Sequence, residues 1–253
     1  MRRRSYRIPC LVAQALLGLI VAASTSSAQS VDKLDHFWCY IVSSETPQPA
    51  TDATLIDQFF VAPGVAVKVG SPLEFCNPVS AKVIGGISQT IFFNMEDHLT
   101  MYHLQKSPTL PAPRTLVASN QFGAAQQLTV DKATTLMVPT QKDQIAFPAA
   151  LNHFLCYPVS GKSLAQTVTL TDQFQTQNVI VEAPTLFCNP VQKTTTSGTF
   201  GDSTDTGHLL CYDIRLPKST TARHPQITNQ IETDTFTVTS TPELCVPSTK
   251  TLP

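Results

Sequence analysis

The chain has 253 residues, of which 14 % are charged, well below the roughly 25 % of an average globular protein. Four of its 17 basic residues lie within the first seven positions, so the rest of the chain carries 13 basic and 18 acidic residues, a net charge of −5. This balance argues against a nucleic-acid-binding protein, which needs a basic surface.

Residues 1–28 have the three parts of a secretory signal peptide: an arginine-rich head, an apolar stretch over 11–23 and small residues that end at Ala28. The apolar stretch is shorter than the ~20 residues that span a membrane, and no later stretch is longer. We expect cleavage after Ala28 and an exported protein of the periplasm, cell surface or extracellular space, without a membrane span. Arg3 and Arg4 also fit a twin-arginine export signal.

One pattern returns four times in the remaining chain. Each copy opens with a His-apolar-x-Cys-Tyr group, has an Asp/Asn-Gln-apolar group in the middle and closes with a Cys-x-Pro group before a lysine. Copies one and three share Asp-Gln-Phe and Cys-Asn-Pro, whereas copies two and four share Asn-Gln and Val-Pro, which gives the order ABAB. The pattern predicts a duplicated pair: one half over 29–142, a stiff connector over 143–152 and a second half over 153–253. The openers begin at His36, His98, His153 and His208, the middle groups at Asp57, Asn120, Asp172 and Asn229, and the lysines are Lys82, Lys142, Lys193 and Lys250.

Six cysteines follow the leader, and in an oxidising compartment six cysteines predict three disulfides. Copy two has methionine at both of its cysteine positions, Met101 and Met137. Replacing both partners of one disulfide by a soft apolar residue keeps the packing and leaves no lone thiol. This favours pairing within each copy, although crossed pairings among the three intact copies remain open. The favoured pairs are Cys39–Cys76, Cys156–Cys188 and Cys211–Cys245.

The short segments 65–69, 167–171, 178–181 and 235–239 are rich in Thr and Val and alternate in polarity, which predicts half-buried strands. The openers are apolar on both faces and should be central strands. Pro and Gly recur too often for long helices. We therefore expect an all-β protein with six to eight strands per half, each half sandwich-like or barrel-like. Whether the halves fold separately or share one core is open.

A family resemblance rests on three motifs of copy three. His-Phe-Leu-Cys-Tyr at 153–157, Asp-Gln-Phe at 172–174 and Leu-Phe-Cys-Asn-Pro-Val at 186–191 resemble an uncharacterised group of exported bacterial repeat proteins, classed as a domain of unknown function. The resemblance covers most of residues 35–250. It implies an exported β-rich protein and no known activity, so no functional residue is transferred from it.

The repeated polar residues could form metal sites. One histidine per copy supplies a single ligand, and Cys-x-x-Cys or His-x-x-x-His spacings are missing from the sequence, so we expect the four histidines to be structural. The middle Asp and Asn residues lack the dense acidic loop of a calcium site, and we expect them to cap turns. We predict no metal and no cofactor.

A catalytic site has equally little support. Carboxylates that could serve a glycosidase are available, but nothing in their spacing pairs them. A Gly-x-Ser-x-Gly nucleophile motif does not occur, and Trp38, which could stack on a sugar if exposed, is expected in the core. We predict that the protein is not an enzyme. The carboxylates considered are Glu74, Glu96, Asp97, Glu182, Glu232 and Glu243.

Variation between the copies concentrates in the polar loops 43–53, 193–207 and 218–225, where rigid β-scaffolds often bind partners. The interpretation that fits best is an exported, non-enzymatic binding module of the cell envelope, with an envelope polysaccharide or a surface protein as its partner. The alternatives are a purely structural component of a surface assembly and a secreted hydrolase.

Overall fold

The computed structural model describes residues 30–216 and 221–253, so the expected signal peptide lies outside the described residues. The chain is all-β, as predicted, and the expected strands fall within β3, β12, β13 and β17. A single 3-10 turn, η1 (Val31–Lys33), precedes them. The strands are β1 (Phe37–Ser44), β2 (Thr51–Ile56), β3 (Val65–Pro78), β4 (Ala81–Ile84), β5 (Ile87–Ser88), β6 (Leu99–Leu104), β7 (Thr109–Asn120), β8 (Gly123–Lys132), β9 (Thr135–Pro139), β10 (Gln141–Lys142), β11 (His153–Pro158), β12 (Gln166–Thr171), β13 (Thr176–Thr195), β14 (Gly198–Phe200), β15 (His208–Arg215), β16 (Gln226–Thr228) and β17 (Thr233–Thr251).

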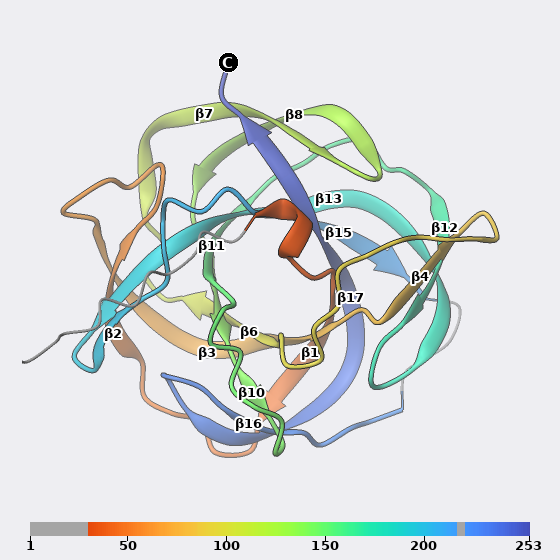
Figure 1. The fold of residues 1–253 in the computed structure, drawn as a ribbon. Coiled ribbons are helices and arrows are strands. Elements are labelled where there is room, and N and C mark those ends of the chain that lie inside the picture. Colours follow the sequence, from red (N-terminus) through yellow and green to blue (C-terminus); the bar gives the residue numbers. More distant parts are fainter. Residues whose placement is uncertain (1–29, 217–220) are drawn as a thin grey trace, which may run out of the picture.

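Eight strands close into one antiparallel barrel in the order β1, β3, β6, β9, β11, β13, β15, β17 and back to β1 (Figure 1). Each sequence copy supplies two of these strands, its opener and its closer. The two halves meet at β9–β11 and at β17–β1. The question left open by the sequence is thereby answered: the halves share one barrel and one core.

The barrel strands are apolar on both faces because they separate two buried layers. Their inward side chains form a compact inner cluster that includes the six cysteines of the described residues. Met101 and Met137 are direct cross-strand partners between β6 and β9, in the place that a disulfide takes in the other copies. The structure pairs the cysteines within each copy: Cys39–Cys76, Cys156–Cys188 and Cys211–Cys245.

Four hairpins cover the outside of the barrel: β2–β3, β7–β8, β12–β13 and β16–β17. The outward side chains of the barrel strands are buried beneath them in a larger outer cluster. Trp38 is fully buried in this cluster, so the prediction that it belongs to the core is confirmed.

Each copy is also joined to its counterpart in the other half, copy one with copy three and copy two with copy four. After its proline, the closing segment of each copy pairs with the middle strand of that counterpart, as in β4–β12, β10–β16, β13–β2 and β17–β7. The opener tyrosines follow the same rule: Tyr40 donates to Asp172 at 2.7 Å, and Tyr157 donates to Asp57 at 2.8 Å. These contacts interlock the two halves.

The segments that precede the four openers all lie at the barrel end where the openers begin. We call this end the connector face, formed by residues 30–36, 85–97, 143–152 and 196–207. Figure 1 looks onto it, with η1 lying over the middle of the barrel. Leu34 and Leu151, at equivalent places before copies one and three, are buried in the inner cluster and close the barrel at this end. Within the described parts of the chain, no helix is long and apolar enough to cross a membrane.

Candidate functional site

The repeated histidines and lysines meet beside the connector face, where each copy contributes one cluster. In copy one, Lys82 Nζ lies 3.0 Å from His36 Nε2 and donates to the side chain of Gln121, which belongs to copy two. In copy three, Lys193 Nζ and His153 Nε2 each lie 2.7 Å from Gln230 Oε1, which belongs to copy four. Each cluster therefore bridges consecutive copies.

Burial governs the charges in these clusters. Burial and, after it, the positive lysine of the same copy lower the pKa of His36, His153 and His208 to about 3. Burial also lowers the pKa of Lys82 to about 7 and that of Lys193 to about 8. The histidines are therefore neutral at pH 7, and in the first of these clusters the ring nitrogen faces an ammonium group instead of an open ligand position.

The Asp and Asn residues of the middle groups cap turns, the role expected for them. Asp57 Oδ1 accepts the backbone N–H groups of Phe59 and Phe60 at 2.8 and 2.7 Å. Its other oxygen accepts Tyr157 Oη, as described above, and Asn189 Nδ2 at 2.9 Å. One carboxylate thus fixes its own turn and joins two copies.

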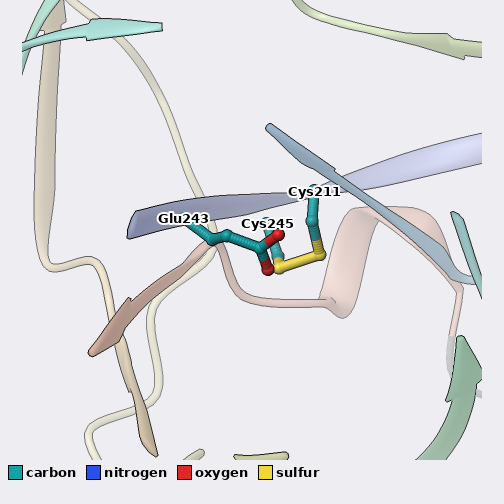
Figure 2. A group of neighbouring side chains, drawn as sticks. All are labelled: Cys211, Glu243 and Cys245. Carbon is teal, nitrogen blue, oxygen red and sulfur yellow. A yellow bond between two sulfur atoms is a disulfide. The ribbon is translucent and has the colours of Figure 1, made fainter. Parts of the chain in front are cut away.

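One group of three metal-ligand side chains occurs among the described residues: Cys211, Glu243 and Cys245 (Figure 2). The two sulfur atoms are joined in a disulfide and carry no thiolate, the form that binds metal. Glu243 lies beside this bond inside the barrel and accepts a hydrogen bond from Thr185 at 2.7 Å. The group is core packing next to a buried carboxyl.

The candidate glycosidase carboxylates do not form one site. Glu74 and Glu243 are near enough for Glu243 to raise the pKa of Glu74, but both point into the barrel, where Glu243 is buried and Glu74 is half-buried. Glu232 accepts from Tyr102 at 2.8 Å, and Glu182 pairs with Arg215 on the surface.

Two hollows open on the connector face. The N-terminal hollow, of about 430 Å³, is lined by Leu34, His36, Phe92 and Pro247 among others. The linker hollow, of about 360 Å³, lies beside the 143–152 connector. Its lining includes the equivalent residues of the other half: Leu151, His153, Phe200 and Pro139. The duplication of the chain has therefore placed a hollow at the same position in each half, but the linker hollow has more polar and aromatic side chains in its lining.

The linker hollow combines aromatic and polar side chains. Phe147, which is 37 % exposed, and Phe200 supply rings, while Asp202, Asp205 and Gln230 supply polar groups. The backbone comes very close at Gly201, where φ is +81° and a Cβ would lie 2.4 Å from the Val191 carbonyl oxygen. Only glycine fits at this position.

Hydrogen bonds hold the polar side of the linker hollow in place. The Asn152 amide donates to Asp205 Oδ2 and to the Asp202 carbonyl oxygen, both at 2.6 Å, and the Asp202 N–H donates back to Asn152 Oδ1 at 2.9 Å. Asp202 in turn caps the turn at Thr204. The loop 196–207 is thereby fixed against the start of copy three.

The sequence predicted the loop over 193–207, which lines the linker hollow, as a place for binding, but it predicted only a stiff connector over 143–152 and no binding loop over 85–97. Part of loop 218–225 lies outside the described residues. A signal was present in the repeated Leu-Asp-His at 34–36 and Leu-Asn-His at 151–153, which extends the copies into the connectors.

The structure and its site were compared with known proteins. No curated protein matches the chain, and no solved structure matches it. The model of a protein family described as a repeat of unknown function, DUF7450, matches residues 98–247, which is more than half of the chain. The resemblance stated from the copy-three motifs is thereby confirmed at the level of an uncharacterised repeat family. The chain belongs to this family of repeats of unknown function.

Proposed function

We propose that the protein is an exported, non-enzymatic binding module that holds a saccharide unit of an envelope or extracellular polysaccharide in the linker hollow. The observation that carries this proposal is the composition of that hollow, in which two phenylalanine rings are combined with carboxylate and amide groups. Three disulfides support export, because such bonds persist in oxidising compartments.

A sugar ring matches such a lining. Its C–H face packs on an aromatic ring, and its hydroxyl groups form hydrogen bonds with carboxylates and amides. The hollow, at about 360 Å³, lies at the small end of the usual range for ligand pockets, which suits one or two sugar units. The loop 196–207 is already held in place by hydrogen bonds, so ligand binding loses little conformational entropy in this loop.

The same hydrogen bonds favour a binding role over hydrolysis. Asp205 already accepts from Asn152, and Asp202 Oδ1 accepts both the backbone N–H and the hydroxyl of Thr204. A glycosidase needs one carboxylic acid and one carboxylate placed on either side of the scissile bond. Carboxylates that are held in place by such hydrogen bonds are suited to accepting hydrogen bonds from sugar hydroxyl groups.

The test is a binding screen of the oxidised protein, residues 29–253, against an array of envelope polysaccharides, followed by calorimetry on any hit. F200A should weaken binding about fivefold, since an aromatic contact of this kind contributes about 1 kcal/mol. F92A, the matched change in the N-terminal hollow, should leave the affinity unchanged. Equal affinity of F200A and the unsubstituted protein, or no saccharide bound by a folded protein, would overturn the proposal.

A protein partner is a second candidate, favoured by a different observation. Ile87, Phe93 and Met95 on the 85–97 connector are exposed by 69, 42 and 53 %. Exposed apolar clusters of this kind mark interaction surfaces. If this surface binds a surface protein, F93S/M95S should abolish capture of that protein while F200A should not. Ordered self-association lost in the same variant would instead identify a structural component of an assembly.

A further inference from the structure

Two aspartates from different copies share a buried hydrogen bond on the connector face. Asp35 precedes His36 at the start of copy one and is 0 % exposed, and Asp97 precedes His98 at the start of copy two and is 3 % exposed. Asn94 brings their carboxyl groups together, because its N–H donates to Asp35 Oδ1 at 3.2 Å and its side chain donates to Asp97 Oδ1 at 2.9 Å, and the two carboxyl groups lie within hydrogen-bonding reach of each other. An ionised carboxylate can only accept a hydrogen bond, so this contact requires that one of the two carboxyls carry a proton.

The second half contains the same arrangement with one difference. Asn152 takes the place of Asp35, and its amide donates to Asp205 Oδ2 at 2.6 Å. The surrounding backbone is equivalent: the Asn94 N–H donates to Asp35 Oδ1 at 3.2 Å, as the Asp202 N–H donates to Asn152 Oδ1 at 2.9 Å. An amide carries its hydrogens at every pH between 4 and 10, whereas a carboxyl must bind a proton to make the same bond.

The connector itself is fastened by this pair. The Asn94 side chain donates to Asp97 Oδ1 at 2.9 Å and accepts the Glu96 N–H at 3.2 Å, while the Asn94 N–H donates to Asp35, so the turn over 94–97 depends on both aspartates. Ile91 and Phe92, a few residues earlier on the same connector, line the N-terminal hollow. The position of that wall of the hollow is therefore tied to the bond between the two carboxyls.

The charged groups that act on the pair are acidic. Burial and, after it, the neighbouring Asp97 raise the pKa of Asp35 to about 9, against the opposing effect of the Asn94 hydrogen bond. Burial also raises the pKa of Asp97 and Glu96 adds to this, whereas the hydrogen bonds with Asp35 and Asn94 lower it. The histidines that follow the aspartates have lowered pKa values because they are buried and face Lys82 and Lys142, so they are neutral near pH 7.

We propose that Asp35 and Asp97 form a proton-dependent latch that holds the 85–97 connector, and with it one wall of the N-terminal hollow, whereas Asn152 and Asp205 hold the equivalent loop 196–207 independently of pH. The latch does not depend on which ligand the hollows bind. It gives one of the two hollows, which occupy corresponding places in the two halves, a response to pH.

The direction of the response follows from proton binding. The fastened pair keeps its proton up to about pH 9, whereas a released, solvated aspartate loses its proton near 3.8. Because the fastened state binds one more proton over this interval, each rise of one pH unit favours release by up to tenfold. Below this interval the latch has its full stability, and above it the effect levels off.

Amide hydrogen exchange measured by NMR on the ligand-free protein between pH 5 and 9 tests this proposal. The reporters are the N–H groups of Asn94 and Asp202, with rates corrected for the intrinsic effect of pH. The protection of Asn94 should fall steadily, by up to tenfold per pH unit, while that of Asp202 stays constant.

Two matched variants exchange the two arrangements. D35N should make the protection of Asn94 independent of pH, and N152D should give Asp202 the pH dependence that Asn94 has in the unsubstituted protein. The latch would be overturned if protection changed equally with pH at Asn94 and Asp202 in the unsubstituted protein. It would also be overturned if the pH dependence of protection at Asn94 were unchanged in D35N. If D35N does not fold, the slope gained or not gained by Asp202 in N152D decides the question. No ligand enters this experiment, so its result is separate from that of the saccharide screen.

Discussion

A fourth disulfide should form in the copy that lacks one. Met101 and Met137 lie directly opposite each other on β6 and β9, as the paired cysteines do on the corresponding strands of the other copies. Both methionines are buried in the inner cluster that contains the three disulfides. The double substitution M101C/M137C therefore places two cysteines in a position that the barrel already uses three times.

The expected gain in the free energy of unfolding is the stabilisation by the new disulfide minus the cost of replacing two buried methionines. The new bond would close a loop of about 36 residues, which stabilises by about 3.8 kcal/mol in the chain-entropy model. This loop contains no other cysteine, so the existing disulfides do not shorten it. Replacing each buried methionine by the smaller cysteine costs roughly 1 kcal/mol, about half of the lower costs found for truncation to alanine. The net gain is about 2 kcal/mol.

Urea unfolding monitored by fluorescence of the buried Trp38 measures this gain. With a slope of about 2 kcal/mol/M, the midpoint of the oxidised variant should rise by about 1 M urea. The single substitution M101C is the control, because it truncates the core without closing a loop and should lower the midpoint. Thiol titration in denaturant reports whether the bond has formed. A variant that forms the bond but unfolds at a lower urea concentration than the unsubstituted protein would refute the reasoning from equivalent positions.

Two further predictions concern buried polar groups. Burial raises the pKa of Glu243 from 4.5 to about 7, so the contribution of Glu243 to stability falls as the pH rises through this interval. E243Q should make the free energy of unfolding less dependent on pH and raise it by on the order of 3 kcal/mol at pH 8. The exposed control E45Q should change neither quantity. A lower stability of E243Q than of the unsubstituted protein at pH 8 would contradict this. Y157F removes the hydroxyl that donates to Asp57 and should lower the free energy of unfolding in urea by about 1–3 kcal/mol. A decrease below about 0.5 kcal/mol, roughly the smallest net contribution of a hydrogen bond, would show that this bond between copies does not stabilise the protein.

The sequence by itself determined the features that depend on neighbouring residues. The alternation of polar threonine with apolar residues identified strands such as 167–171, because successive side chains of a strand point to opposite faces of the sheet. The apolar character of the openers on both faces marked them as central strands. The joint loss of both cysteines in copy two indicated which cysteine positions face each other.

The candidate site was only partly accessible to this reasoning. The loop over 193–207 was singled out for its variation, but the hollows also need the connectors 85–97 and 143–152 and prolines from distant closers. The neighbouring positions of Asp35 and Asp97, which both accept hydrogen bonds from Asn94, depend on a contact between residues that lie in different copies. Such contacts leave no local pattern in the sequence.

Closure of the barrel was decided by the tertiary structure. The strands counted for one half suggested a barrel or sandwich of its own, but each copy uses its middle strand in an outer hairpin and places only two strands in the barrel. Four strands cannot close a barrel, and their free edges would remain unpaired. The edges of the two halves therefore pair with each other at β9–β11 and β17–β1, and this pairing gives eight strands, one core and two equivalent hollows.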